Sequence, residues 1–172
     1  MAATAPEWDH KKSVVRWPHP LLDQLDLETR LGEQNVPVVT SRLNPDEDKK
    51  AQREVIRKNV IDAYMGITAA DFCLADTATL VMKTRVDQAR SVSLVPSIHV
   101  AVIHLDQLLA DLKELYTMLR WDTDQQAEGL THHMVLISGP SKTADIELVM
   151  VHGAHGPRAV HMIVITGGLT AS

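Results

Sequence analysis

The order of its apolar segments is the feature that most limits how this chain can fold. Short runs rich in valine, isoleucine and leucine alternate with segments of helical spacing near both ends, and only strand-type runs lie between them. Residues 105–119 carry the clearest helical spacing, with leucines recurring three and four positions apart. Alternating strands and helices build parallel sheets, whereas consecutive strands favour antiparallel pairs. The sequence therefore predicts an α/β fold with a mixed, mostly parallel sheet flanked by helices.

Turn and cap residues divide the chain into segments of these two kinds. Strands are expected at 13–17, 36–40, 71–75, 78–83, 92–95, 98–104, 134–137 and 160–165. Helices are expected at 21–31, from a cap at Asn44 or Asp46 to Tyr64, at 105–119 and at 143–151. Gly32 and Gly66 are placed to end the first two helices. The second helix is expected to turn one stripe inward (Ala51, Val55, Ile56, Val60, Ala63) and a basic stripe to solvent (Lys49, Lys50, Arg53, Arg57, Lys58).

Length and charge argue against several classes of protein. A chain of 172 residues suits one domain, which we expect to span residues 13–172 after a loose segment at 1–12. The net charge is −5 and no basic stripe of the kind that binds nucleic acid is visible. The first residues lack a signal-peptide pattern, and no apolar run approaches the ~18 residues of a membrane span. We therefore expect a cytoplasmic protein with no nucleic-acid or membrane partner.

The sequence contains one cysteine, Cys73, which lies between Phe72 and Leu74. It has no partner for a disulfide within the chain, and an iron–sulfur cluster normally needs about four thiolate ligands. Free cysteine commonly packs as a small apolar side chain. We predict a buried strand thiol and no cofactor bound by this chain alone.

The segment SGPSKTADIE at 138–147 joins a buried-type strand to a predicted helix through a Gly-Pro bend. A helix start at the carboxyl end of a strand presents free N–H groups and partial positive charge to an anion. Hydroxyl groups and a lysine add to this, so a small anionic ligand is predicted at Ser138, Gly139, Ser141, Lys142 and Thr143. The alternative, given equal weight, is that a hydroxyl caps the helix and the bend is only a turn.

Histidines follow in the segment HGAHGPR at 152–158. His152 and His155 stand three residues apart, but the spacing fixes no third metal ligand, so no metal is assigned. We expect His155 to lie beside the pocket as a hydrogen-bond donor or proton shuttle. Gly156 allows the backbone to turn there.

Three further polar residues are candidates for the same pocket. Asp76 and Thr77 lie between two predicted strands, where they either line the pocket or form a plain turn. Arg90 either clamps a ligand carboxylate with its guanidinium or occupies an ordinary surface position.

Four segments, taken in order, resemble the LutC/YkgG lactate-utilisation family, whose members carry the LUD domain. They are GITAADFCLADTATLV at 66–81, RSVSLVP at 90–96, SGPSKTADIE at 138–147 and GAHGP at 153–157. The resemblance extends from about Ser13 to Ile165. Two features depart from it: members usually carry more chain before the first strand, and His152 stands where they tend to have an apolar residue or glycine.

The resemblance implies a fold like that of the NagB/RpiA/CoA-transferase group and a part in oxidising L-lactate to pyruvate. It also implies two iron–sulfur partner proteins, and the single cysteine agrees with placing the electron carriers in those partners. Two other functions stay open: an independent enzyme or binding protein for a phosphorylated sugar, folate or CoA ester, and a module that only binds other proteins. Catalysis by this chain and formation of a homo-oligomer are also left open.

Overall fold

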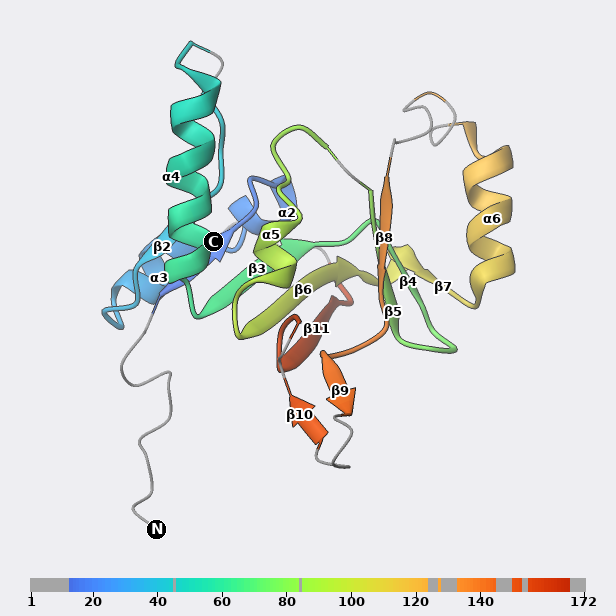
Figure 1. The fold of residues 1–172 in the computed structure, drawn as a ribbon. Helices are drawn as coiled ribbons and strands as arrows, with labels where there is room; N and C mark the ends of the chain where they lie inside the picture. The colour runs from blue at the N-terminus through green and yellow to red at the C-terminus, as the bar shows by residue number, and fades with distance from the viewer. Residues whose placement is uncertain are drawn as a thin grey trace.

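The computed structural model describes residues 13–44, 46–83, 85–123, 127, 133–144, 150–152 and 155–167. Its main sheet has five strands in the order β11-β6-β3-β1-β2, and every neighbouring pair is parallel (Figure 1). These strands are β1 (Val14–Arg16), β2 (Val38–Thr40), β3 (Met65–Ala69), β6 (Ile98–His104) and β11 (Ala159–Ile165). The prediction of a mostly parallel α/β sheet is confirmed. The segment predicted to be loose, residues 1–12, lies outside the described part.

A second sheet has four strands in the order β7-β4-β5-β8. They are β4 (Phe72–Leu74), β5 (Thr79–Lys83), β7 (Leu108–Leu109) and β8 (Met134–Ile137). Strand β5 is antiparallel to both of its neighbours, whereas β4 and β7 are parallel. Strands β4 and β5 follow one another in the chain without a helix between them, which favours their antiparallel pairing. A separate antiparallel hairpin, β9 (Lys142–Ala144) with β10 (Met150–His152), lies below β11 in the view of Figure 1.

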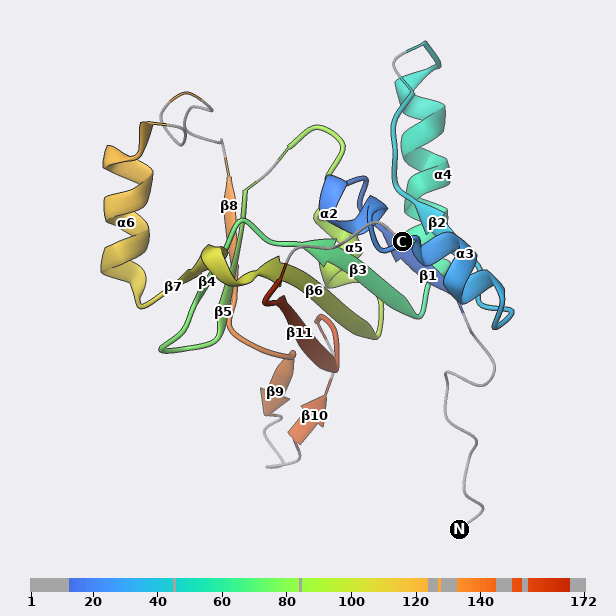
Figure 2. The ribbon, with the colours of Figure 1, turned by 180° about the vertical axis from the view of Figure 1, so that it is seen from behind.

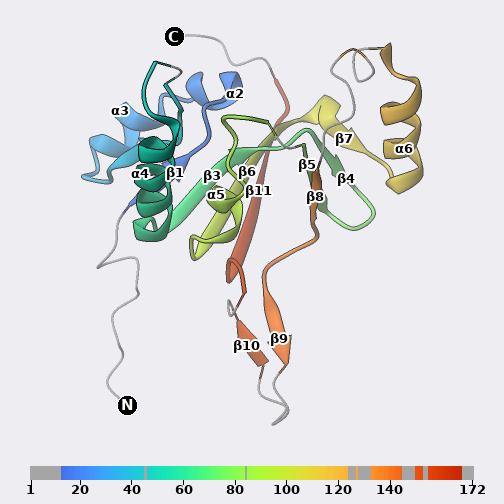
Figure 3. The same cartoon turned by 45° about the horizontal axis from the view of Figure 1, so that its top comes forward.

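The described helices lie around the two sheets. They are α2 (Pro20–Asp23), α3 (Leu27–Gly32), α4 (Lys49–Asp62), α5 (Ser91–Leu94) and α6 (Leu112–Trp121), with a 3₁₀ turn at Leu105–Gln107. Figures 2 and 3 show α2, α3 and α4 near β1 and β2, α6 on the other side of the molecule beside β4 and β7 of the second sheet, and α5 between them, where it contacts β3 and β6. Within the described residues, no helix has the length and apolar character that crossing a membrane requires.

Two predicted helices have different limits because polar residues cap or break them. The predicted helix 21–31 divides into α2 and α3, since Asp26 adopts a left-handed backbone conformation with φ of 46°. The helix predicted over 105–119 begins at Leu112. Asp111 fixes that start, because its carboxylate accepts hydrogen bonds from two backbone N–H groups of the first turn.

Helix α4 also begins later than predicted. Its cap is Asp48, whose carboxylate accepts a hydrogen bond from the N–H of Lys50 over 3.0 Å, and neither Asn44 nor Asp46 holds that position. The predicted inward stripe is wrong at Ala51 and Val55, which are exposed, Val55 by 59%. Val60 is in the core and Ile56 packs against it, so only the second half of α4 turns this stripe inward.

Two segments adopt a different kind of structure from the predicted one. The predicted strand 92–95 lies largely in α5, a short helical turn in which the Ser93 hydroxyl donates to the Arg90 carbonyl over 2.9 Å. The predicted helix 143–151 is wrong, because residues 142–144 and 150–152 pair as the strands β9 and β10. Residues 145–149 lie outside the described part of the chain.

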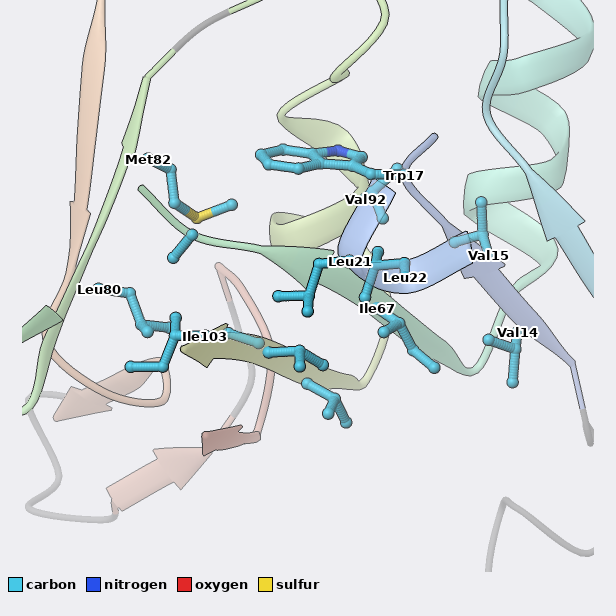
Figure 4. Close-up of a cluster of buried hydrophobic side chains, with 14 of the residues drawn as sticks. Val14, Val15, Trp17, Leu21, Leu22, Ile67, Leu80, Met82, Val92 and Ile103 are labelled. Carbon is cyan, nitrogen blue, oxygen red and sulfur yellow. The ribbon is translucent and has the colours of Figure 1, made fainter. Parts of the chain in front are cut away.

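A single cluster of buried apolar side chains joins the two sheets. Figure 4 shows its members from β1, α2, β3, β5, α5 and β6: Val14, Val15, Leu21, Leu22, Ile67, Leu80, Met82, Val92 and Ile103. Trp17 also belongs to this cluster, and its indole N–H donates to the carbonyl of Ala89 over 2.9 Å. Cys73 is fully buried on β4, as predicted, and burial raises the pKa of its thiol.

Candidate functional site

The first two sequence motifs meet where Gly66 of β3 lies against α5. A Cβ atom added at Gly66 would lie 1.8 Å from the carbonyl oxygen of Val92 and 3.2 Å from Cγ of Pro96. Only glycine lets the strand and the helical turn approach this closely. Gly66 therefore does not end a helix, as predicted from the sequence, but fixes the motif at 90–96 onto β3.

The first and third motifs meet through a row of hydroxyl groups. Thr79 of β5 is buried, and its Oγ1 lies 2.8 Å from Oγ of Ser138, the residue that follows β8. Oγ1 of Thr77 lies 2.8 Å from Oγ1 of Thr79 and donates to the Asp76 carboxylate over 3.1 Å. The antiparallel pairing of β5 with β8 thus joins three predicted site residues, Asp76, Thr77 and Ser138, through a fourth residue.

The third and fourth motifs meet at Ser141. Its backbone N–H donates to the carbonyl of Pro157 over 2.8 Å, and its Oγ accepts a hydrogen bond from the N–H of His155 over 3.3 Å. A Cβ atom added at Gly156 would lie 3.3 Å from Cβ of Ser141 and 4.0 Å from the carbonyl oxygen of Leu94 in α5. The loop before β11 is therefore held between the bend and α5.

All four motifs, far apart in the sequence, are thus linked by direct contacts. We use the name motif junction for these residues: Asp76, Thr77, Thr79, Leu94, Ser138, Gly139, Ser141, Lys142, His155, Gly156 and Pro157. Gly139 turns the chain there with φ of 148°, a conformation that favours glycine.

The profile of the LUD domain matches residues 11–165, nearly the whole chain. This chain belongs to the LUD domain family. Among relatives of this LUD domain, Lactate utilization protein C from Halalkalibacterium halodurans is 32% identical over 154 residues, which are 89% of this chain and 63% of that protein. Lactate utilization protein C from Bacillus subtilis is 33% identical over 110 residues, which are 62% of this chain and 45% of that protein.

The chain that carries this LUD domain spans less than two thirds of the length of these curated relatives. Among solved structures, a DUF162 family protein from Deinococcus radiodurans is similar, with a TM-score of 0.48 and 16% identity. The alignment covers 90% of this chain and 88% of the other.

The hydrogen bonds that join Ser138, Thr79, Thr77 and Asp76 in this LUD domain all point the same way along the row. Each hydroxyl carries one proton. Because Thr77 donates to Asp76, Thr79 must donate to Thr77, and Ser138 must donate to Thr79, if all three hydrogen bonds form together. The Ser138 oxygen then has no proton for a ligand but keeps lone pairs that accept one. This end of the motif junction is an acceptor.

The Ser141 end of the motif junction is a donor. Its oxygen accepts the His155 N–H, so its own proton is available to a ligand. Lys142, the next residue in the chain, is exposed. The predicted helix N-terminus does not contribute, because residues 142–144 form β9, whose backbone pairs with β10. The side chain of Thr143, another predicted site residue, lies outside the described part.

Arg90 is the predicted site residue that the structure leaves apart. It is exposed and borders a small recess together with Trp17, Lys83 and Gln88. In the described residues, its hydrogen bonds within the second motif run through its carbonyl oxygen, which accepts from the N–H and the hydroxyl of Ser93, and not through its guanidinium. Across the same residues, no three His, Cys, Asp or Glu side chains are grouped as metal ligands.

Sequence reasoning missed three residues of the motif junction, Thr79, Leu94 and Pro157, the last of which offers its carbonyl to the N–H of Ser141. Thr79 connects the first motif to the third, and Leu94 offers its carbonyl to the turn at Gly156. For Thr79 a signal was present, since it stands two positions after Thr77 at the start of an apolar strand, where a polar side chain is unusual. For Leu94 no signal was present, because a backbone carbonyl leaves no trace in the sequence.

Proposed function

We propose that this LUD domain is part of an L-lactate oxidation system, in which lactate becomes pyruvate, and that it works beside iron–sulfur partner proteins. The names of its relatives, lactate utilization protein C, support the pathway. The partners are supported by the chain's own composition. Its only cysteine is buried on β4, so thiolate ligands for an electron-carrying cluster have to come from other proteins.

We further propose that the motif junction holds the lactate. L-lactate carries a carboxylate, which accepts hydrogen bonds, next to a hydroxyl, which donates one. The bend at 138–141 offers the opposite pattern: Ser141 has a proton to donate and Lys142 a positive charge, while the proton of Ser138 is committed to Thr79. This opposed pair of hydroxyls within one bend is the observation that carries the proposal.

The exposure of the motif junction suits a site that is completed by a partner. Ser138, Lys142 and His155 are exposed, so water competes with lactate at each of them in the isolated chain. A partner protein that covers the bend would exclude this water and strengthen the same hydrogen bonds. We therefore expect weak lactate binding by the chain alone.

Growth on L-lactate tests the first part of the proposal. Deleting the gene in its natural host is expected to abolish growth on L-lactate but not on pyruvate. The wild-type gene should restore growth, and Ser138→Ala and Ser141→Ala should restore it poorly. Thr117→Ala is the matched control, because that exposed hydroxyl bonds only to a carbonyl of its own helix, α6. Normal growth of the deletion strain on lactate would contradict the proposal.

Ligand binding to the purified protein tests the second part. In an NMR titration with L-lactate, shifts are expected at the N–H groups of the bend. Ser141→Ala should weaken binding at least tenfold, since a hydrogen bond to a charged group contributes about 1.5–3 kcal/mol. Stabilisation by CoA or a sugar phosphate in a thermal-shift assay, with no response to lactate, would favour the independent enzyme instead.

A further inference from the structure

A hollow of about 500 Å³ lies between α4 and the chain segment 86–95 that leads into α5. The two walls can be followed in Figure 1. Ser41 borders the hollow and comes directly after the carboxyl end of β2. Small-molecule sites commonly measure about 300–1,000 Å³, and in open α/β sheets ligands bind beyond the carboxyl ends of the strands. Size and position therefore both match a ligand site.

Two arginines of α4 give the hollow a positive wall. Arg53 and Arg57 stand four residues apart, so both project from the same side of the helix into the lining. Both are exposed, and neither forms an ion pair with a described residue. The lining contains one carboxylate, that of Asp87, against these two guanidiniums. Two like charges at this spacing repel each other, and an anion bound between them would remove that repulsion.

The rest of the lining is mainly apolar and remains in contact with water. Ile61, Val86 and Val95 border the hollow and are 52%, 86% and 50% exposed. Ile56 and Val60 of α4 line it more deeply. Apolar side chains gathered around one exposed hollow mark a place where a ligand covers them.

Ser41 adds a polar group that lacks a partner. The residue is 2% exposed, and its Oγ has no hydrogen-bond partner among the described residues, although its N–H donates to the Arg16 carbonyl over 2.8 Å. Buried hydroxyls without a partner are rare in native proteins. An acceptor atom of a bound ligand is one group that would satisfy it.

We propose that this hollow binds a small molecule that carries a carboxylate or phosphate on an apolar body. The guanidiniums of Arg53 and Arg57 hold the anionic group, and the apolar body lies against Ile56, Val60 and Val95. The ligand is bulkier than lactate. Most of the lining is apolar, and lactate has too little apolar surface to cover it. No residue of the motif junction lines the hollow, although α5 borders both. The inference is thus independent of the lactate proposal.

A fluorescent aromatic anion, 8-anilinonaphthalene-1-sulfonate, is a suitable probe for this site. We expect one saturable site on the folded chain at a temperature well below its unfolding transition. The double variant Arg53→Gln/Arg57→Gln should weaken probe binding at least tenfold, with an unchanged circular dichroism spectrum. The matched control is Lys49→Gln/Lys50→Gln, which removes two charges from the same helix at positions outside the lining and should bind as the wild type does.

Competition then identifies the anionic group. Either 1-naphthyl phosphate or 1-naphthoate should displace the probe, and the stronger competitor names the group that the arginines prefer, while the neutral 1-naphthol should displace it at least tenfold less well. Two results would overturn the inference: equal probe binding by the arginine variant and the wild type, or equal displacement by 1-naphthol and the two anions. Neither result bears on growth on lactate.

Discussion

Gly66 shows how one residue fixes the relation between two elements. It is the second residue of β3, where a side chain would normally pack, yet the Val92 carbonyl oxygen of α5 lies only 1.8 Å from the position that its Cβ would take. The contact is between backbone atoms on both sides, so it cannot be relieved by rotation of a side chain. The position of α5 therefore depends on the lack of a side chain at Gly66. The second motif, which contains α5, is positioned in the same way.

We predict that Gly66→Ala destabilises the protein by about 3 kcal/mol or more, because the strand and α5 must separate to admit the methyl group. Urea unfolding followed by circular dichroism measures the change. The control is Gly32→Ala at the end of α3, where an added Cβ meets nothing within 4 Å. That substitution should leave stability unchanged or raise it by up to about 1 kcal/mol. Equal effects of the two substitutions would refute the close contact.

At the scale of elements, the starts of α4 and α6 are set by aspartates and not by the beginning of apolar periodicity. Leucines recur from Leu105 onward, but α6 starts only at Leu112, where Asp111 accepts from the N–H groups of Lys113 and Glu114 over 2.8 and 2.9 Å. The preceding leucines form a 3₁₀ turn and β7 instead. The same side-chain chemistry starts α4 at Asp48.

We predict that Asp111→Ala lowers the free energy of unfolding by about 1 kcal/mol, the usual cost of losing an N-cap. The measurement is again equilibrium unfolding in urea. Asp106→Ala serves as the comparison, since that aspartate lies in the 3₁₀ turn just before α6 and makes no described side-chain hydrogen bond. It should change stability by less than about 0.5 kcal/mol. A larger loss at Asp106 than at Asp111 would be inconsistent with this cap.

At the scale of the whole molecule, a histidine is enclosed in the main sheet. His99 of β6 is fully buried, and its Nε2 lies 2.8 Å from Oγ1 of Thr68 in β3. Its Nδ1 has no hydrogen-bond partner among the described residues. Burial lowers the pKa of His99 to about 4, so the ring is neutral in the folded protein near neutral pH.

We predict that the protein loses stability as the pH falls from about 6.5 to 4. The unfolded chain binds a proton at His99 near pH 6.5, whereas the folded chain does so only near pH 4, so acid favours unfolding across this window. The total loss is about 3 kcal/mol, from the 1.36 kcal/mol that each pKa unit represents. Urea unfolding at several pH values measures it.

His99→Gln should remove most of this dependence, since glutamine can still bond to Thr68 but does not titrate. A smaller part should remain, because burial also lowers the pKa of His19. An unchanged slope between pH 6.5 and 5 in the glutamine variant would exclude His99 as its main source.

A second effect sets in at lower pH. Partial burial opposes ionisation of Glu28, but hydrogen bonds from Arg16 and Thr40 outweigh it and lower the pKa of Glu28. Its contribution to stability is therefore lost only as the pH falls below about 4.5.

The sequence by itself determined the local character of most segments and the family. Branched apolar runs at 98–104 and 134–137 are strands because such side chains favour a pleated, buried backbone. The four motifs were recognisable from their order and spacing, and Cys73 was expected to be buried from its neighbours alone. These properties depend on residues that are close together in the chain.

Only the tertiary structure decided what these segments contact. Thr79 and Ser138 are 59 residues apart and meet because β5 and β8 pair. Strand pairing likewise makes residues 142–144 and 150–152 a hairpin, where the sequence suggested a helix. Gly66, which the sequence suggested as the end of a helix, lies in β3 against a carbonyl of α5. Arg53 and Arg57 are exposed, as expected, but they also line a hollow that the sequence did not predict. Hydrogen bonds between distant backbones and the space between packed elements have no local pattern, so residue spacing alone could not predict them.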